Sequence, residues 1–265
     1  MKVVLINDTS MWNPHFGCQL VGQTFREQFA RVGIDCVASL ALGEDDLRAN
    51  EELLAAADLV VINGEGSVHH GRNLHLTELP ARYPAVFVNA VFQENPRCDG
   101  LSQARLVSVR DEASRRELKA QGIDAIVTPD AIFASALLRA FQKPQPTMDI
   151  GFTDNVVDPS SGFTVKVPFV ADYLRTLCSY ERLCIGRFHS AIAAAVLGIP
   201  FSTWPSNTHK IEELMAAIGV SHLHAQDLEG AEAICPLDFD PRISDFATSA
   251  ARQVRDLFDR IAGLG

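Results

Sequence analysis

Short apolar runs alternate with segments of helical periodicity along most of the chain. The runs have the length of β-strands, and the segments between them gather apolar residues on one helix face, as Val21, Phe25 and Phe29 do before Gly33. This alternation favours parallel sheets built from β-α-β units, so the sequence predicts an α/β protein. The expected strands are residues 3–7, 36–40, 59–63, 85–91, 106–109, 125–127, 148–152, 183–185 and 201–204. The further expected helices are residues 45–57, 111–121, 169–178, 190–197, 210–218 and 244–261.

Two prolines near the middle of the chain, Pro144 and Pro146, interrupt the alternation, because proline breaks both helices and strand ladders. They make residues 142–146 the best candidate for a linker. A chain of 265 residues is also long for one α/β domain. We therefore expect an N-terminal Rossmann-like domain over residues 1–143 and a C-terminal Rossmann-like domain over residues 147–265.

The composition, 47% hydrophobic and 21% charged, is that of an ordinary globular protein. No apolar run approaches the ~20 residues that span a bilayer, and the chain enters its first strand without an apolar signal core, so the expected location is the cytoplasm. A net charge of −10 argues against nonspecific binding to nucleic acid. Any anionic substrate must therefore be held by a local cluster of basic side chains.

Cysteine and histidine spacing gives no sign of a metal site. The six cysteines form no Cys-x-x-Cys pair and are expected to be reduced. His69, His70 and His75 lie close together in the sequence, but not at the spacings that bind zinc on a helix. The sequence therefore predicts neither a metal nor a cofactor.

The segment 183–200 is the most informative one, because its apolar run ends at Arg187 and His189 before an alanine-rich helix. A strand that ends at Gly186 would project both side chains from the carboxyl edge of a sheet, beside the N–H groups of a helix beginning near Ser190. Guanidinium, imidazole and helix dipole would then converge on one phosphate or carboxylate. The alternative is structural: His189 caps the helix and Arg187 pairs with an acidic residue.

A second polar stretch follows the strand at residues 59–63. Gly64 and Gly66 permit close backbone approach and Ser67 could donate to an anion, although a tight turn between strand and helix is the alternative. Glu65 is different, because a carboxylate repels a phosphate. It fits better as a general base or a contact to a sugar.

Two further places carry candidate ligands. Arg110 ends the strand at 106–109 and is an expected anion ligand, while Asp111 fits either the N-cap of the next helix or a catalytic role. Asn207 and Lys210 lie at the start of a later helix, where Lys210 is either an anion ligand or a solvated side chain.

Taken in order, these motifs resemble the polysaccharide pyruvyl transferase family, over residues 3–215. The matching pieces are the Asn13 to Gly17 loop, Gly64-x-Gly66-Ser67, Val109-Arg110-Asp111-x-x-Ser114, Gly122-Ile123, Pro129-Asp130, Gly186-Arg187-Phe188-His189-Ser190-Ala191, Gly198-Ile199-Pro200 and Lys210. The resemblance implies two Rossmann-type domains in a GT-B-like arrangement. It also implies transfer of a pyruvyl group from phosphoenolpyruvate to hydroxyls of a cell-envelope glycan, forming a ketal. Arg110, Arg187 and His189 match the family positions that hold the donor's phosphate and carboxylate.

The chain departs from this family at Glu65, where a small residue is usual, and it is shorter than most members. An acidic residue beside glycine also resembles the GT-B transferases of sialic acid and Kdo, which use CMP-activated acidic sugars. There Glu65 would be a base or nucleophile, and Arg187, His189 and Ser190 would bind the nucleotide phosphate. A third alternative, a noncatalytic sugar-binding or assembly subunit, is disfavoured because the polar pocket residues occur together.

The resulting expectations are specific. Pyruvyl transfer needs a proton donor and a base, roles that His189 and Glu65 could share. The expected partners are phosphoenolpyruvate or a CMP-sugar as donor and a glycan as acceptor, and no oligomeric state is predicted. The candidate residues are His189, Glu65 and Asp111 for catalysis, Arg110, Arg187, Ser190, Gly64, Gly66, Ser67, Asn207 and Lys210 for donor binding, and Asn13 and His69 for acceptor binding.

Overall fold

The computed structural model describes residues 1–143 and 145–264, and the chain forms two compact units. Unit 1 comprises Met1–Asn13, Gly22–Ala131 and the chain from Gln253 onward, whereas unit 2 comprises Pro14–Val21 and Ile132–Arg252. Pro144 of the expected linker lies outside the described residues. The two units are thus interleaved along the sequence. The domain boundary expected near residues 143–147 stays a prediction.

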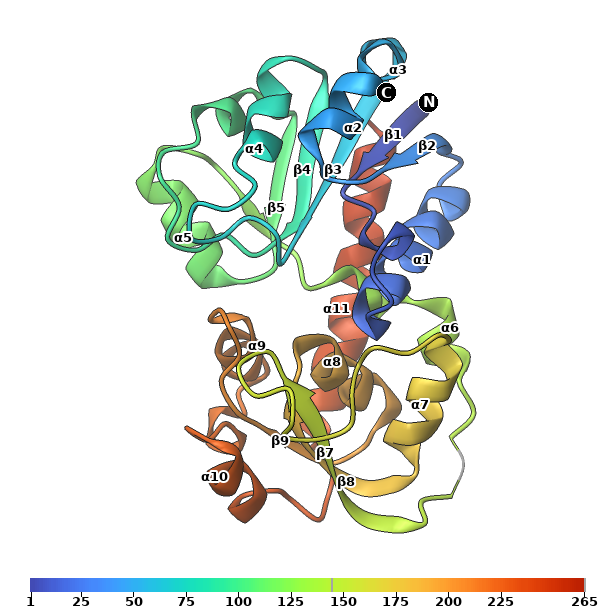
Figure 1. Ribbon diagram of the computed structural model, residues 1–265, viewed down its shortest axis with the longest axis vertical. Helices are drawn as coiled ribbons and strands as arrows, with labels where there is room; N and C mark the ends of the chain where they lie inside the picture. The colour runs from blue at the N-terminus through green and yellow to red at the C-terminus, as the bar shows by residue number, and fades with distance from the viewer. Residues whose placement is uncertain (144, 265) are drawn as a thin grey trace. The chain divides into compact units, whose positions relative to one another are not determined.

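Unit 1 is built on a six-stranded parallel sheet (Figure 1). Its strands, in the order β2-β1-β3-β4-β5-β6, are β2 (Asp35–Leu40), β1 (Lys2–Ile6), β3 (Leu59–Glu65), β4 (Ala85–Ala90), β5 (Leu106–Val109) and β6 (Ile126–Val127). The direction of this order reverses between β1 and β3. Such a switch point, at the carboxyl ends of the strands, is where open α/β sheets bind ligands.

Helices pack their apolar residues on this sheet. The core cluster that contains Val60 also takes Leu47, Leu54, Leu76 and Leu118 from four helices. These helices are α2 (Glu44–Ala49), α3 (Glu51–Ala56), α4 (His75–Glu78) and α5 (Glu112–Ala120). A separate aromatic group joins α1 (Phe16–Arg31) to α11 (Pro241–Ala262), where the ring of Phe258 lies 5.2 Å from Phe25 and 5.6 Å from Phe29.

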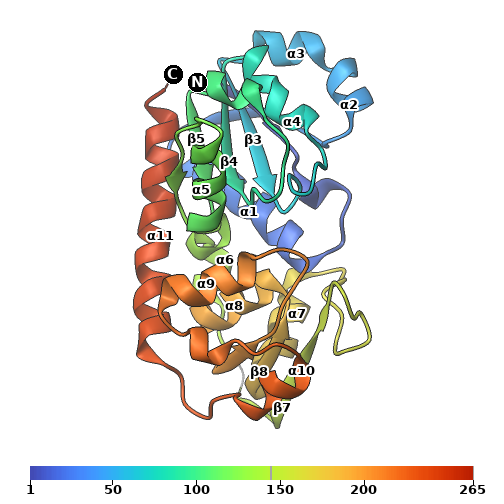
Figure 2. The same ribbon diagram turned by 90° about the vertical axis from the view of Figure 1, so that its left-hand side faces the viewer.

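Unit 2 holds a second parallel sheet, in the order β7-β8-β9, made of β7 (Met148–Asn155), β8 (Tyr180–Gly186) and β9 (Phe201–Thr203). Helix α8 (Phe188–Leu197) lies between α7 (Val170–Cys178) and α9 (Lys210–Ile218) (Figure 2). Almost all of α8 is buried, and its alanines allow that close packing. Shorter helices are α6 (Ala136–Ala140) and α10 (Leu228–Ala233), and 3-10 turns occur at Thr9–Met11, Leu79–Ala81, Asp99–Gln103, Ala131–Ala134 and Ser221–Leu223.

The predicted α/β class with parallel sheets is confirmed, but several expectations about elements are wrong, and three examples follow. The helix expected at residues 45–57 is divided into α2 and α3 at Asn50, whose backbone is non-helical. Helix α8 begins at Phe188 rather than near Ser190, and β3 continues through Glu65, beyond the expected strand end. Within the described residues, no helix is long and apolar enough to cross a membrane.

Candidate functional site

Arg187 occupies the N-cap position of α8, directly after β8 ends at Gly186. Its Nε and Nη2 donate to Oδ1 and Oδ2 of Asp154 at 2.9 and 3.0 Å. Asp154 is buried near the end of β7, so this bidentate pair fixes the guanidinium plane while using only part of its five N–H donors. The alternative that Arg187 pairs with an acidic residue is therefore confirmed. His189 is not the helix cap, because it lies inside α8.

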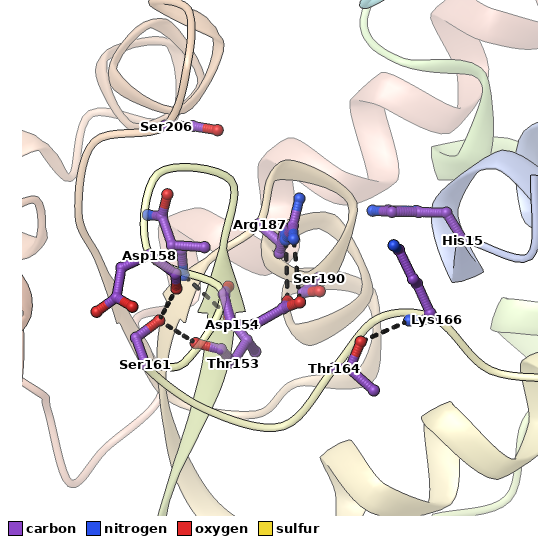
Figure 3. A network of polar contacts seen from close by, with 12 residues as sticks. His15, Thr153, Asp154, Asp158, Ser161, Thr164, Lys166, Arg187, Ser190 and Ser206 are labelled. Carbon is purple, nitrogen blue, oxygen red and sulfur yellow. Dashed lines mark hydrogen bonds and ion pairs between the residues drawn. The ribbon is translucent and has the colours of Figure 1, made fainter.

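His15 lies just before α1, opposite Lys166 on a short antiparallel pairing of two distant segments. The Phe16 N–H donates to the Val165 carbonyl at 2.8 Å and the Val167 N–H donates to the Pro14 carbonyl at 3.1 Å. Side chains directly opposite in such a pair are neighbours on one face. Figure 3 shows the side chains of His15 and Lys166 directed toward Arg187.

His189 packs against the start of α1 at Gly17. A Cβ on Gly17 would lie 2.0 Å from Nδ1 of His189, far inside any real contact. The imidazole rings of His15 and His189 are 6.2 Å apart and nearly perpendicular. Glycine at this position therefore allows the two histidines to approach each other.

The basic side chains whose charges act on His15 are those of Lys166, Arg187, His189 and Lys210. We call them, together with His15, the basic cluster. Burial, followed by the nearby His189, Arg187, Lys210 and Lys166, lowers the pKa of His15 from 6.5 to about 3. His15 is consequently neutral at pH 7. The cluster thus concentrates positive charge in a chain whose net charge is −10, and such a concentration attracts anions.

The remaining candidates of unit 2 are Asn207, which contacts Lys210 of the cluster, and Ser190. Lys210 Nζ donates to Asn207 Oδ1 at 2.6 Å, so the structure brings these two candidates together at the start of α9. Ser190 does not face solvent. Its buried hydroxyl lies 2.8 Å from that of Tyr173, a contact between α7 and α8, and burial raises the pKa of Tyr173. We therefore assign Ser190 to packing rather than to a ligand.

A separate polar group lies at the switch point of unit 1. Asn7 follows β1 and Glu65 ends β3, and both have left-handed backbones, with φ of 60° and 43°. The Thr9 hydroxyl donates to Glu65 Oε2 at 2.6 Å, and Asn7 Nδ2 donates to Ser67 Oγ at 3.0 Å. Strained backbone of this kind is typical of functional sites. The structure therefore brings Glu65 and Ser67 into one polar group, with two residues that the sequence motifs did not mark.

The glycine and histidine candidates of unit 1 have local roles in the structure. Gly64 lies within β3, where a Cβ would come 2.4 Å from the Cβ of Ala90, so glycine is required by packing against β4. Gly66 follows in the turn after that strand. His69 is buried with Nδ1 2.7 Å from Nδ1 of His70, and the Asn13 N–H donates to the Thr9 carbonyl at 3.2 Å. Their expected roles in binding stay predictions.

Arg110 is buried and does not form an accessible anion site. Its Nη2 lies 2.7 Å from Asp130 Oδ2, with side-chain exposures of 2% and 0%, and its Nε donates to Asn89 Oδ1 at 3.2 Å. This buried ion pair holds the guanidinium in the interior of unit 1.

Asp111 follows Arg110 in the chain and lies at the start of a helix. Its Oδ1 accepts the Ser114 N–H at 2.7 Å, which confirms Asp111 as the N-cap of α5.

His15, Asp154 and Lys166 were not found by sequence reasoning. Asp154 had a usable signal, because it is a polar residue at the end of an apolar strand. His15 lies in the Asn13 to Gly17 loop, but no signal placed it beside Lys166, since their neighbourhood depends on backbone pairing between segments 14–16 and 165–167. Among the described residues, no group of three or more His, Cys, Asp or Glu side chains is arranged to hold a metal.

No protein-family model matches the chain, and no curated protein matches it. Solved structures share its fold, among them the following two. A functionally uncharacterised protein from Klebsiella pneumoniae has a TM-score of 0.60 and 14% identity, covering 85% of this chain and 93% of that one. UDP-GlcNAc 2-epimerase from Methanocaldococcus jannaschii has a TM-score of 0.54 and 11% identity, covering 97% of this chain and 99% of that one. At such identities the similarity concerns the fold alone.

Proposed function

We propose that this protein is a sugar-active enzyme that binds a phosphorylated donor at the basic cluster of unit 2. The observation that carries the proposal is that His15 and Lys166 are directed toward Arg187 in an otherwise acidic chain, where the charge of Lys210 also acts on His15. Guanidinium and ammonium groups are the side chains that bind phosphate best. A sugar substrate is supported by the fold shared with an epimerase named for UDP-GlcNAc.

The donor that we propose is phosphoenolpyruvate, as the motif resemblance implies. It carries a phosphate and a carboxylate, and a cluster with several cationic side chains suits two anionic groups. In the reaction, two sugar hydroxyls form C–O bonds to C2 of phosphoenolpyruvate, and the bond between C2 and the phosphate oxygen breaks. The methylene carbon takes up one proton and becomes a methyl group. The two hydroxyls release two protons, of which one replaces the proton taken up by the methyl group and the other leaves with phosphate. His189, within the cluster, is the proposed proton donor.

A polar group in unit 1 also supports the proposal of a sugar substrate. Asn7, Thr9, Glu65 and Ser67 place amide, hydroxyl and carboxylate groups at the switch point of the sheet. Such groups hydrogen-bond the hydroxyls of sugars. Glu65 is the proposed base for an acceptor hydroxyl, and Glu65→Gln should then reduce turnover by about 10² to 10⁴ without weakening donor binding.

Calorimetric titration with phosphoenolpyruvate, CMP and UDP tests the donor. We expect phosphoenolpyruvate to bind the wild-type protein, and Lys166→Met to weaken that binding about 10-fold or more, as for loss of a charged hydrogen bond. Arg175→Met is the matched control, because Arg175 is an exposed cation on α7 of the same unit that pairs with Asp172. Binding of CMP but not phosphoenolpyruvate would instead support the CMP-sugar alternative. Binding of none of the three would refute a phosphorylated donor at this cluster.

A further inference from the structure

We propose that His15 contacts the substrate, donating a hydrogen bond from Nε2 of a neutral imidazole to the anion held at the basic cluster. This inference rests on the proposed function. It adds a binding residue that was not among the candidates named from the sequence, although it lies within the Asn13 to Gly17 loop. It also gives that residue a role distinct from those of Lys166 and Arg187.

The tautomer of His15 follows from its backbone contact. The Gly17 N–H donates to Nδ1 of His15 at 3.0 Å, so Nδ1 acts as the acceptor. In a neutral imidazole the other nitrogen then carries the proton, an assignment made from the hydrogen-bond network. Nε2 is therefore a donor, at the end of a ring that Figure 3 shows directed toward Arg187.

The position of this donor is fixed by its surroundings. Gln19 Nε2 donates to the carbonyls of Pro14 and Val167, at 3.0 and 2.9 Å, and so joins the two paired segments. The ring of Phe16, next in the chain, lies 4.5 Å from that of Tyr173. A donor held in place before the ligand arrives costs little entropy on binding.

A neutral imidazole at His15 is a suitable hydrogen-bond donor within the basic cluster. The positive charges that act on His15 are those of His189, Arg187, Lys210 and Lys166, and a further positive charge would be repelled by them before an anion binds. A neutral N–H supplies a directed hydrogen bond without that repulsion. The arrangement thus combines cations that attract the anion with an uncharged group that orients it.

Two substitutions separate the roles of the two ring nitrogens. An asparagine amide reaches about as far as Nδ1 of histidine, so His15→Asn keeps an acceptor for the Gly17 N–H and removes the distal donor. A glutamine amide reaches about as far as Nε2, so His15→Gln keeps the distal donor and removes the acceptor. A purely structural His15 would be replaced better by asparagine, which also caps helices well.

The test is calorimetric titration of both variants with phosphoenolpyruvate and with inorganic phosphate, together with thermal unfolding. We expect His15→Asn to unfold near the wild-type temperature and to bind phosphoenolpyruvate at least about 10-fold more weakly. His15→Gln should unfold at lower temperature and bind within about threefold of the wild type.

Wild-type affinity in His15→Asn, or equal losses of affinity in both variants, would overturn the role of Nε2. In both of those outcomes the wild-type protein still binds phosphoenolpyruvate, so they are distinct from failure of the proposed function. If the wild-type protein binds neither phosphoenolpyruvate nor phosphate, the proposed function fails and the role of His15 fails with it.

Discussion

Gly17 lies where the start of α1 meets the imidazole of His189, and the contact leaves no room for a side chain. Gly17→Ala would place a Cβ 2.0 Å from Nδ1 of His189, so the histidine must move. We expect a lower unfolding temperature and a loss of phosphoenolpyruvate affinity of about 10-fold or more in calorimetry. Gly43→Ala is the control, because a methyl group there meets no atom within 4 Å. Unchanged affinity in Gly17→Ala would show that the position of His189 does not matter for binding.

Single residues also show why only part of the site could be predicted. Arg187, His189 and Lys210 belong to local motifs, at a strand end and at helix starts, and the sequence marked them. The closeness of His15 and Lys166 had no local signal, because a pairing of residues far apart in the chain makes them neighbours. Arg110 shows the opposite error. A cation at a strand end was expected to face a ligand, but its partner Asp130 buries it.

At the scale of elements, strands were the easiest to predict. Parallel strands covered on both faces form continuous apolar runs, as in β3 and β4, whose residues are all buried. The ends of elements were harder, because they depend on turns and packing. Helix α8 begins at Phe188, directly after Arg187, whose backbone is still extended, and the helix expected at residues 45–57 breaks at Asn50.

The start of α5 gives a prediction at this scale. Asp111 accepts the Ser114 N–H at 2.7 Å and so caps the helix. Asp111→Ala should lower the free energy of unfolding by about 0.5 to 2 kcal/mol, the usual loss for an N-cap, as measured by urea titration. Asp111→Asn or Asp111→Ser, which keep a capping oxygen, should recover most of that loss. A catalytic role for Asp111 would instead appear as loss of turnover in Asp111→Asn at unchanged stability.

At the scale of the whole molecule, the environment of His15 makes stability depend on pH. Burial and the nearby His189, Arg187, Lys210 and Lys166 lower its pKa to about 3, from 6.5. Between these values the unfolded chain binds a proton that the folded protein excludes, so this contribution to stability is complete above pH 6.5 and is lost as the pH falls toward 3. The slope is at most about 1.4 kcal/mol per pH unit.

His15→Gln removes this titration and isolates it from all the others. We expect the free energy of unfolding of the wild-type protein to fall more steeply than that of His15→Gln as the pH decreases from 6.5 toward 4. Urea unfolding at a series of pH values measures both slopes. Parallel curves would mean that His15 titrates normally in the folded protein.

Fold similarity at 11% and 14% identity leaves the chemistry of this molecule to its own residues. The central claim is that the basic cluster of unit 2 binds a phosphate-like anion. Its most direct test is anomalous diffraction from crystals grown with tungstate, a heavy tetrahedral oxyanion that can replace phosphate. The account predicts a tungsten peak within contact distance of Arg187 and Lys166 that is lost in Lys166→Met. Tungstate bound only elsewhere, or an unchanged peak in that variant, would contradict it.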